Sequence, residues 1–364
     1  MLNPRPLQLD DPDDCSRWDR FCRESEDAWF WHTSDWLRYQ RAYRPELSSR
    51  NRSFFLEDGP ELVAICPLLE ETPRAGLVEL GAGGSPAPAP ALVSRRDAGH
   101  RRDTARAVFE AVDAAAAQCG AARVAFRDSP LPAGFARRAA LGNPLLEFGY
   151  LDVSLRTQVI DLEPPETELW TGLRKGHRSD VRRAERTLRV EVFDAGTIRD
   201  EMFEAYRGLH AKAAGRVTRP DVTFELMHDW IRRGDALLVA ARARGALISV
   251  AFLLVYNAAA YYASGANDPE MEGPGIAHLV QWRAMQELRA RGVRRYEIGW
   301  QQQIPVPHDV ATPKQRSISF FKHGFGGSTW PLFAGEKYYS ASFYRDVAAQ
   351  RSAAFAVELE ARRG

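Results

Sequence analysis

Residues 261–300 read YYASGANDPEMEGPGIAHLVQWRAMQELRARGVRRYEIGW, and they predict a strand, a loop, a helix and a second strand. Aromatic and small residues open the stretch, and two Gly/Pro breaks precede the helix. Apolar residues then recur every three or four positions from Ile276 to Leu288, and Gly292 marks the helix end. A strand–helix–strand unit of this length builds a parallel strand pair. The loop before the helix lies at a helix N-terminus, where backbone N–H groups attract anions and substrates commonly bind.

The composition is that of a globular protein long enough for two domains. The chain has 364 residues, of which 45% are hydrophobic and 27% charged. Its net charge of +1 gives no global reason to bind nucleic acid, so any basic surface must be local. We see no secretory signal and no apolar run long enough to span a membrane. The four cysteines lack metal-ligand spacing, so we expect free thiols, no metal and a cytoplasmic location.

The two halves of the chain repeat one predicted order of elements: helix, hairpin, third strand, Gly/Pro loop, long helix, strand. In the first half, the hairpin turns at Asp58-Gly59 and the Gly/Pro loop spans 81–90. In the second half, the hairpin turns at Gly245 and the loop belongs to the stretch 261–300. We therefore predict an α/β protein of two similar domains, 1–155 and 156–364, with a linker near 153–165. The last helix, 341–363, could pack back on the first domain.

Residues 173–189, LRKGHRSDVRRAERTLR, concentrate positive charge. The segment has seven Arg or Lys residues and two acidic residues, so its net charge is +5 in a chain whose total is +1. The spacing of Arg178, Arg182 and Arg186 predicts one helix face. The run is either a solvated helix face or a surface for phosphate or RNA. The residues that would form this surface are Arg174, Lys175, Arg178, Arg182, Arg183 and Arg186.

Three motifs in this order resemble the Fem-type branch of the GNAT superfamily. They are LRKGHRSDVRRAER at 173–186, the stretch 261–299 ending in RGVRRYEIG, and ISFFKHGFGG at 318–327. The first half, with HTSDWLRYQRAY and GAGGSPAPAP, is similar in general arrangement. The resemblance implies two tandem acyl-CoA-N-acyltransferase-like (GNAT-like) domains with mixed sheets. It also implies a transferase, because many members move an amino acid from aminoacyl-tRNA to an amine, among them enzymes of cell-wall synthesis.

The resemblance places the donor in a wedge between two strands, here 260–264 and 295–299. Acyl-CoA enzymes of this fold hold the pyrophosphate on a Q/R-x-x-G-x-G/A loop, and residues 270–275 stand in its place. Glu270 and Glu272 would repel a pyrophosphate, and Pro274 removes a backbone donor. We therefore expect aminoacyl-tRNA as the donor, with no resident cofactor, and keep acyl-CoA as the alternative.

Lys322 and Glu297 are the catalytic candidates. Transfer of an aminoacyl ester to an amine needs alignment, oxyanion stabilisation and removal of a proton, but no covalent nucleophile. Lys322, placed by the resemblance at the family's Phe-Lys pair, suits the oxyanion or a terminal phosphate of tRNA. It is otherwise an exposed helix lysine. Glu297, on a strand of the wedge, could accept the amine proton, or form an ion pair with Arg294 or Arg295.

The residues expected around the donor and acceptor are Phe321, Tyr262, Trp300, Gln301 and Gln302. Core or loop packing is the simpler explanation of Tyr262, Trp300, Gln301 and Gln302. His278 and His323 are further candidate bases, or ordinary structural histidines. Two other functions stay open: an acyl-CoA-dependent N-acyltransferase, and a non-catalytic RNA- or partner-binding protein on a GNAT scaffold. Since the chain lacks the long helical arm of cell-wall Fem enzymes, we expect a small-molecule or natural-product amine, or a peptide, as acceptor.

Overall fold

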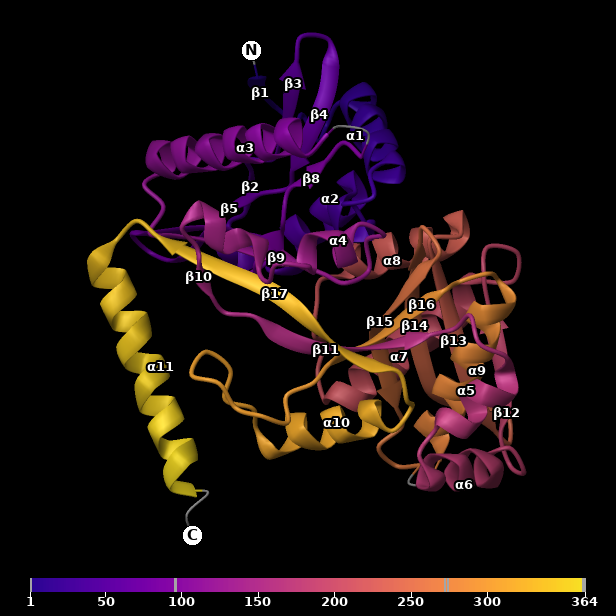
Figure 1. The fold of residues 1–364 in the computed structure, drawn as a ribbon. Coiled ribbons are helices and arrows are strands. Elements are labelled where there is room, and N and C mark those ends of the chain that lie inside the picture. The colour runs from indigo at the N-terminus through magenta and orange to yellow at the C-terminus, as the bar shows by residue number, and fades with distance from the viewer. Residues whose placement is uncertain (1, 95–96, 272, 274, 362–364) are drawn as a thin grey trace. The chain divides into compact units, whose positions relative to one another are not determined.

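The computed structural model describes residues 2–94, 97–271, 273 and 275–361 (Figure 1). The chain forms two compact units. Unit 1 comprises Met1–Arg156, Gln302–Pro313 and Pro331–Gly364, and unit 2 comprises Thr157–Gln301 and Lys314–Trp330. The units differ from the predicted domains 1–155 and 156–364, because the last two segments of unit 1 come from the second predicted domain. One of these segments contains the last helix.

Unit 1 combines two sheets with helices. The smaller sheet has the order β1-β3-β4-β8, and the larger one β17-β9-β6-β5-β2, with β10 on β17 and β7 on β9. The helix α3 ends at Cys119, before the left-handed cap residue Gly120, and buries Val108 and Val112 in the core of the unit. The elements are β1 (Leu2–Pro6), α1 (Pro12–Glu24), α2 (Ser34–Tyr43), β2 (Arg50–Asn51), β3 (Phe54–Asp58), β4 (Glu61–Cys66), β5 (Leu69–Arg74), β6 (Leu77–Gly81), β7 (Ala87–Pro88), β8 (Ala91–Leu92), α3 (Ala98–Cys119), β9 (Arg123–Asp128), α4 (Phe135–Ala139), β10 (Leu151–Asp152), β17 (Ser328–Tyr338) from Pro331 on, and α11 (Ala341–Ala361).

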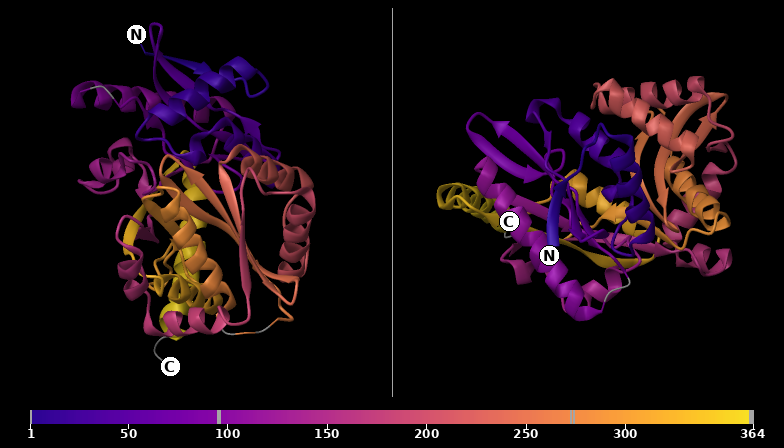
Figure 2. Two further views of the ribbon diagram at one scale, coloured as in Figure 1. Left: turned by 90° about the vertical axis from the view of Figure 1, so that its right-hand side faces the viewer. Right: turned by 90° about the horizontal axis from the view of Figure 1, so that it is seen from above.

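Unit 2 is a mixed sheet of order β12-β13-β14-β15-β16-β11 with helices on both faces (Figure 2). The strand β14 is apolar and buried along most of its length, as expected of a central strand. The helix α9 packs on one face of it and α7 on the other. The elements are β11 (Leu155–Asp161), α5 (Glu166–Gly172), α6 (Lys175–Ala184), β12 (Arg189–Phe193), α7 (Asp200–Ala214), α8 (Asp221–Arg233), β13 (Ala236–Ala243), β14 (Ala246–Tyr256), β15 (Ala259–Asn267), α9 (Ile276–Ala290), β16 (Arg295–Trp300) and α10 (Pro313–His323).

The predicted linker at 153–165 is wrong in part, because Leu155–Asp161 forms the strand β11. This strand pairs antiparallel with β16 from Thr157↔Trp300 to Asp161↔Arg295. The Pro164-Pro165 pair that suggested a linker lies between β11 and α5, where proline suits the start of a helix. The strand β11 matters for function because it lies beside β16, which carries part of the candidate site.

Two smaller expectations concern the cysteines and the membrane. All four cysteines are unpaired in the structure, and Cys15, Cys22 and Cys66 are buried. Among the described residues, the helices are too short or too polar to cross a bilayer.

Candidate active site

Strands β15 and β16 of unit 2 diverge. They pair in parallel from Ala259↔Arg295 to Tyr261↔Glu297. Beyond this point β15 follows β14 as far as Asn267, whereas β16 follows β11 as far as Trp300. The divergence begins at Glu297, so that side chains at the ends of β15 and β16 lie on strands that no longer pair with each other.

Lys322 lies over β16 close to this divergence. Its Nζ would be 2.5 Å from the Cβ of any side chain placed at Gly299, so the glycine leaves the space that the ammonium group uses. Burial lowers the pKa of Lys322, and the charge of Glu297 opposes that effect. The Lys322 ammonium group therefore lies within electrostatic reach of Glu297.

Glu297 is a buried carboxylate in the middle of β16. Glu297 is 2% exposed, and its Oε1 accepts a hydrogen bond of 2.7 Å from Thr157 Oγ1. Arg294, which the sequence suggested as an ion-pair partner, lies instead 3.6 Å from Glu163. Thr157 thus fixes the orientation of Glu297, a role that sequence reasoning did not assign because the strand β11 was not predicted.

Close packing fixes the end of α10 that carries Lys322. A side chain at Gly324 would collide with the ring of His177, and one at Gly327 would collide with the carbonyl of Val159. His177 Nε2 also lies 2.8 Å from the carbonyl oxygen of Phe321. The glycines of the motif ISFFKHGFGG therefore have a packing role: they hold Lys322 in position.

The buried His177 and the partly buried His278 form a ring pair beneath α10. Their centroids are 4.3 Å apart in an edge-to-face arrangement. Arg174 lies 3.2 Å from His177 Nδ1, and because a guanidinium can only donate, Nδ1 accepts and Nε2 carries the proton. Burial lowers the pKa of His278 to about 4, which makes it a weak base at neutral pH. His323, the other histidine candidate, is exposed.

The residues predicted to bind substrates do not all come together. Tyr262 and Phe321 are half-buried and pack against the core of unit 2, and burial raises the pKa of Tyr262 to about 12. Trp300 is the last residue of the strand β16, and Gln301 follows it. Gln302 belongs to unit 1, where its amide donates to both carboxylate oxygens of Asp309, at 2.9 and 3.0 Å.

The basic segment forms a hollow of about 550 Å³ on the surface of α6 and the turn after it. The hollow is lined by Lys175, Arg178, Ser179, Arg182, Arg183 and Arg186. The prediction that Arg178, Arg182 and Arg186 share one helix face is wrong for Arg186, because α6 ends at Ala184. Arg186 nevertheless lies on the same hollow. Five cationic side chains around one depression favour binding of a polyanion.

Some of these cations also have structural contacts. Arg178 donates hydrogen bonds to the carbonyls of Thr171 and Leu173, at 2.7 and 2.5 Å. Arg182 lies 5.3 Å from the Trp170 ring centroid, and Arg174, outside the hollow, lies 4.1 Å from that of Phe320. Arg183 lies 3.8 Å from the Asp180 carboxylate, a pair within the same helix that holds no other element in place. Lys175, Arg183 and Arg186 are therefore better suited to test a role in binding.

The helix α6 lies against the N-terminus of α9. Gly275, which precedes α9, has a φ of +100°, and a side chain there would collide with the backbone carbonyl of Asp180 in α6. In the predicted donor loop, Lys212 Nζ lies 2.7 Å from the Glu270 carboxylate. Glu272 and Pro274 of this loop lie outside the described residues. The carbonyl of Asp180 thus presents partial negative charge at the N-terminus of α9, where the pyrophosphate of an acyl-CoA would bind.

Metal ligation finds no support in the described part of the chain, where no three His, Cys, Asp or Glu side chains converge in a way that could hold an ion.

Residues 172–304 match the family model described as an acetyltransferase (GNAT) domain. This segment is a GNAT domain. It contains the basic hollow, the diverging strands and Glu297, but not Lys322. No curated protein matches the chain.

Solved structures extend the likeness to both units. A FemX crystal structure is 15% identical, with 95% of this chain and 100% of that chain covered and a TM-score of 0.67. L-PGS from Bacillus licheniformis is 15% identical, with 94% and 96% covered and a TM-score of 0.58. The C-terminal domain of a putative lysylphosphatidylglycerol synthetase from Agrobacterium fabrum is 14% identical, with 93% and 94% covered and a TM-score of 0.59. The chain therefore shares the fold of these structures.

Proposed function

We propose that this protein is an aminoacyltransferase that moves an amino acid from aminoacyl-tRNA to an amine and forms an amide bond. The observation that carries the proposal is the position of α6, whose Asp180 carbonyl packs at Gly275 and whose outer surface is a basic hollow. The contact at Gly275 disfavours a pyrophosphate at the α9 N-terminus. The hollow suits the phosphates of an RNA donor.

Lys322 and Glu297 have complementary roles in this reaction. The amine nitrogen attacks the ester carbonyl carbon, and the developing oxyanion is stabilised by the Lys322 ammonium. Glu297 accepts the proton that the nitrogen loses, while Thr157 holds the carboxylate in place. The bond from the carbonyl carbon to the ribose oxygen then breaks, and that oxygen takes the proton from Glu297. The products are an amide and a tRNA with a free hydroxyl group.

Side chains near the strand ends would shape the pockets for the aminoacyl group and the amine. We assign this role to Tyr262, Trp300 and Gln301, since they lie on β15 or at the end of β16. Phe321 is better placed to support α10, because its ring centroid lies 4.9 Å from that of His278.

The test is a transfer assay with purified full-length protein. The reaction contains radiolabelled amino acids, total tRNA, synthetases and a panel of amines, with parallel arms that receive RNase or acetyl-CoA alone. Vesicles of phosphatidylglycerol, which offers hydroxyl groups and no amine, form a separate arm, because one structural neighbour is named as a putative lysylphosphatidylglycerol synthetase. Labelled lipid in that arm would be an ester and would replace the amine by a hydroxyl as the acceptor. We expect labelled product that disappears with RNase. Product that survives RNase and requires acyl-CoA would overturn the proposal.

An acyl-CoA-dependent N-acyltransferase is the second candidate. The observation in its favour is the family model itself, which describes acetyltransferases and matches residues 172–304. A ligand that binds only the native state raises its melting temperature. Clear stabilisation by acetyl-CoA, together with acetylation of an amine, would put this function first.

A further inference from the structure

Unit 1 contains a pocket of about 410 Å³ that the proposed transfer reaction does not use. It lies beside the first half of α3, between that helix, the segment around β8, and the short 3₁₀ helix Pro144–Phe148. Its volume falls within the range of small-molecule sites, roughly 300–1,000 Å³. All of its lining residues belong to unit 1.

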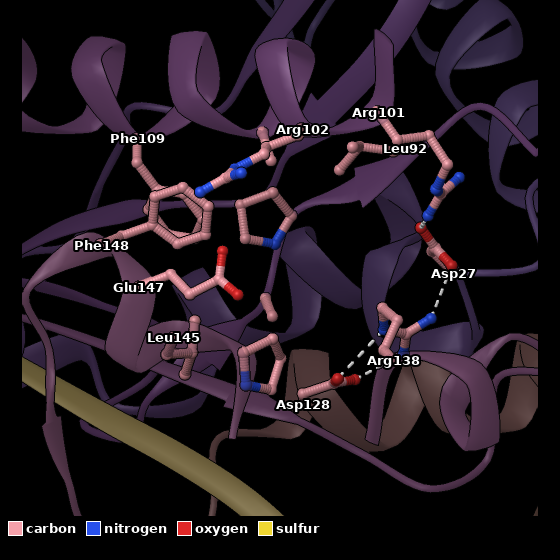
Figure 3. A pocket seen from close by; sticks show the side chains of 14 residues that line it. Asp27, Leu92, Arg101, Arg102, Phe109, Asp128, Arg138, Leu145, Glu147 and Phe148 are labelled. Atoms are coloured by element: carbon pink, nitrogen blue, oxygen red, sulfur yellow. Dashed lines mark hydrogen bonds and ion pairs between the residues drawn. The ribbon is translucent and has the colours of Figure 1, made fainter. Parts of the chain in front are cut away.

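The walls of the pocket are largely apolar. Phe109 and Phe148 stack with their ring centroids 4.1 Å apart, and Leu92, Leu145 and Ala105 complete much of the surface (Figure 3). Aromatic and aliphatic walls favour a ligand with an apolar body, because such a ligand removes this surface from water.

A closed ionic network forms one end of the pocket. Asp27 is 3% exposed. One of its carboxylate oxygens forms an ion pair with Arg101 at 2.5 Å, and the other forms one with Arg138 at 2.6 Å. Arg138 also contacts both oxygens of Asp128, at 3.1 and 2.6 Å. These four groups satisfy one another, so they give the end of the pocket a fixed shape and no net charge to offer a ligand.

The other two charged residues of the lining are different. Arg102 and Glu147 are exposed and direct their charged ends toward the same space beside Phe148 (Figure 3). Among the residues that the structure describes, neither side chain has a hydrogen-bond or ion-pair partner. One free cation and one free carboxylate over apolar walls complement a molecule that carries both charges itself.

We propose that this pocket binds a zwitterionic small molecule with an apolar side chain, that is, an aromatic or branched amino acid. The ligand carboxylate pairs with Arg102, its ammonium group pairs with Glu147, and its side chain lies between Phe148, Leu145 and Leu92. The proposal goes beyond the transfer reaction and does not depend on it, since none of the residues involved belongs to unit 2.

Calorimetric titration of the full-length protein tests the proposal with three probes that share one side chain. These are L-phenylalanine, its amide, which lacks the carboxylate, and N-acetyl-L-phenylalanine, which lacks the ammonium group. We expect the free amino acid to bind best and each derivative to bind about fivefold more weakly, as the loss of an exposed ion pair predicts. Equal binding of all three, or no binding of any at millimolar concentration, would overturn the proposal.

Variants then assign each charge. Arg102→Ala should weaken binding of the free amino acid about fivefold and leave the amide unaffected, because the amide has no carboxylate to lose a partner. Glu147→Gln should leave N-acetyl-L-phenylalanine unaffected in the same way. Both residues are exposed, so these variants should fold. Arg106→Ala, exposed on the same helix and outside the lining, is the matched control and should change nothing. Weakening of all three probes alike by Arg102→Ala would refute the charge assignment.

Discussion

The backbone carbonyl of Asp180 occupies the space that a side chain at Gly275 would need. This contact joins α6, which carries the basic hollow, to the N-terminus of α9, where acyl-CoA enzymes of the fold hold their pyrophosphate. The basic helix and the altered donor loop are therefore parts of one arrangement. Both the basic hollow and the contact at Gly275 would serve a polyanionic donor such as the tRNA proposed above.

Gly275→Ala should lower the free energy of unfolding by about 2 kcal/mol or more, because the methyl group meets the Asp180 carbonyl and the φ of +100° is strained for alanine. Urea denaturation measures the change. Gly176→Ala is the control: Gly176 lies in α6 with no atom within 4 Å of an added methyl group. It should be neutral or stabilising by up to about 1 kcal/mol. Equal effects of the two substitutions would contradict the packing described.

The double variant Arg183→Glu/Arg186→Glu should weaken tRNA binding and reduce the slope of its salt dependence by roughly two units, since two phosphate contacts are lost. Neither residue supports the backbone of α5, as Arg178 does. Filter binding at several salt concentrations gives both quantities. The matched control, Arg244→Glu/Arg294→Glu, removes the same charge from exposed positions outside the hollow. If both double variants bind alike, the hollow is only a solvated surface.

Periodicity and turn signals predict most of the fold. Apolar spacing predicts α9 from Ile276 onward, and the turn signals at Asp58-Gly59 and Gly245 predict the β3–β4 and β13–β14 hairpins, as the structure confirms. These elements have strong local signals, such as apolar spacing and a terminal glycine. The strand β11 was missed because a short strand next to two prolines resembles a linker. Its position depends on pairing with β16, which lies far away in sequence.

Only part of the candidate site can be predicted from the sequence, because the other part depends on contacts between distant segments. Lys322 and Glu297 could be named from sequence, and the structure brings Lys322 within the electrostatic reach of Glu297. Thr157 and His177 were not named as site residues, although His177 stands in the motif LRKGHRSD. Their contacts with Glu297 and Phe321 span 140 and 144 residues. No local pattern reports contacts between segments so distant in sequence.

Acid should destabilise the protein in part through His278. Burial lowers its pKa to about 4, whereas the unfolded value is near 6.5, so the unfolded state binds more protons between these values. Stability is therefore complete above pH 6.5 and falls as the pH decreases toward 4. The groups that face His278 are His177, Asp180 and Arg174. From pH 7 to pH 5 the loss due to His278 should be about 2 kcal/mol.

His278→Gln should make this loss smaller by about the same amount, while His32, whose pKa burial also lowers to about 4, contributes equally to both proteins. Urea denaturation at a series of pH values gives the two slopes. The comparison uses the slopes because the substitution also changes packing at every pH. Parallel pH profiles would mean that His278 is not kept neutral by burial.

The last prediction concerns Lys322, on which the proposed chemistry depends most. Lys322→Ala should lower kcat by ~10²-fold or more, with a smaller change in KM, if the ammonium group stabilises charge that develops in the transition state. Lys314→Ala, an exposed lysine on the same helix, should leave both constants unchanged. Because burial lowers the pKa of Lys322, the wild-type activity should decline at a lower alkaline pH than an ordinary lysine would give, and the decline should be absent from the residual activity of Lys322→Ala. Single-turnover rates across this pH range separate the chemical step from product release. A change in KM alone would make Lys322 a binding residue. An alkaline decline that persists in Lys322→Ala would belong to another group, and the oxyanion would then need a different donor.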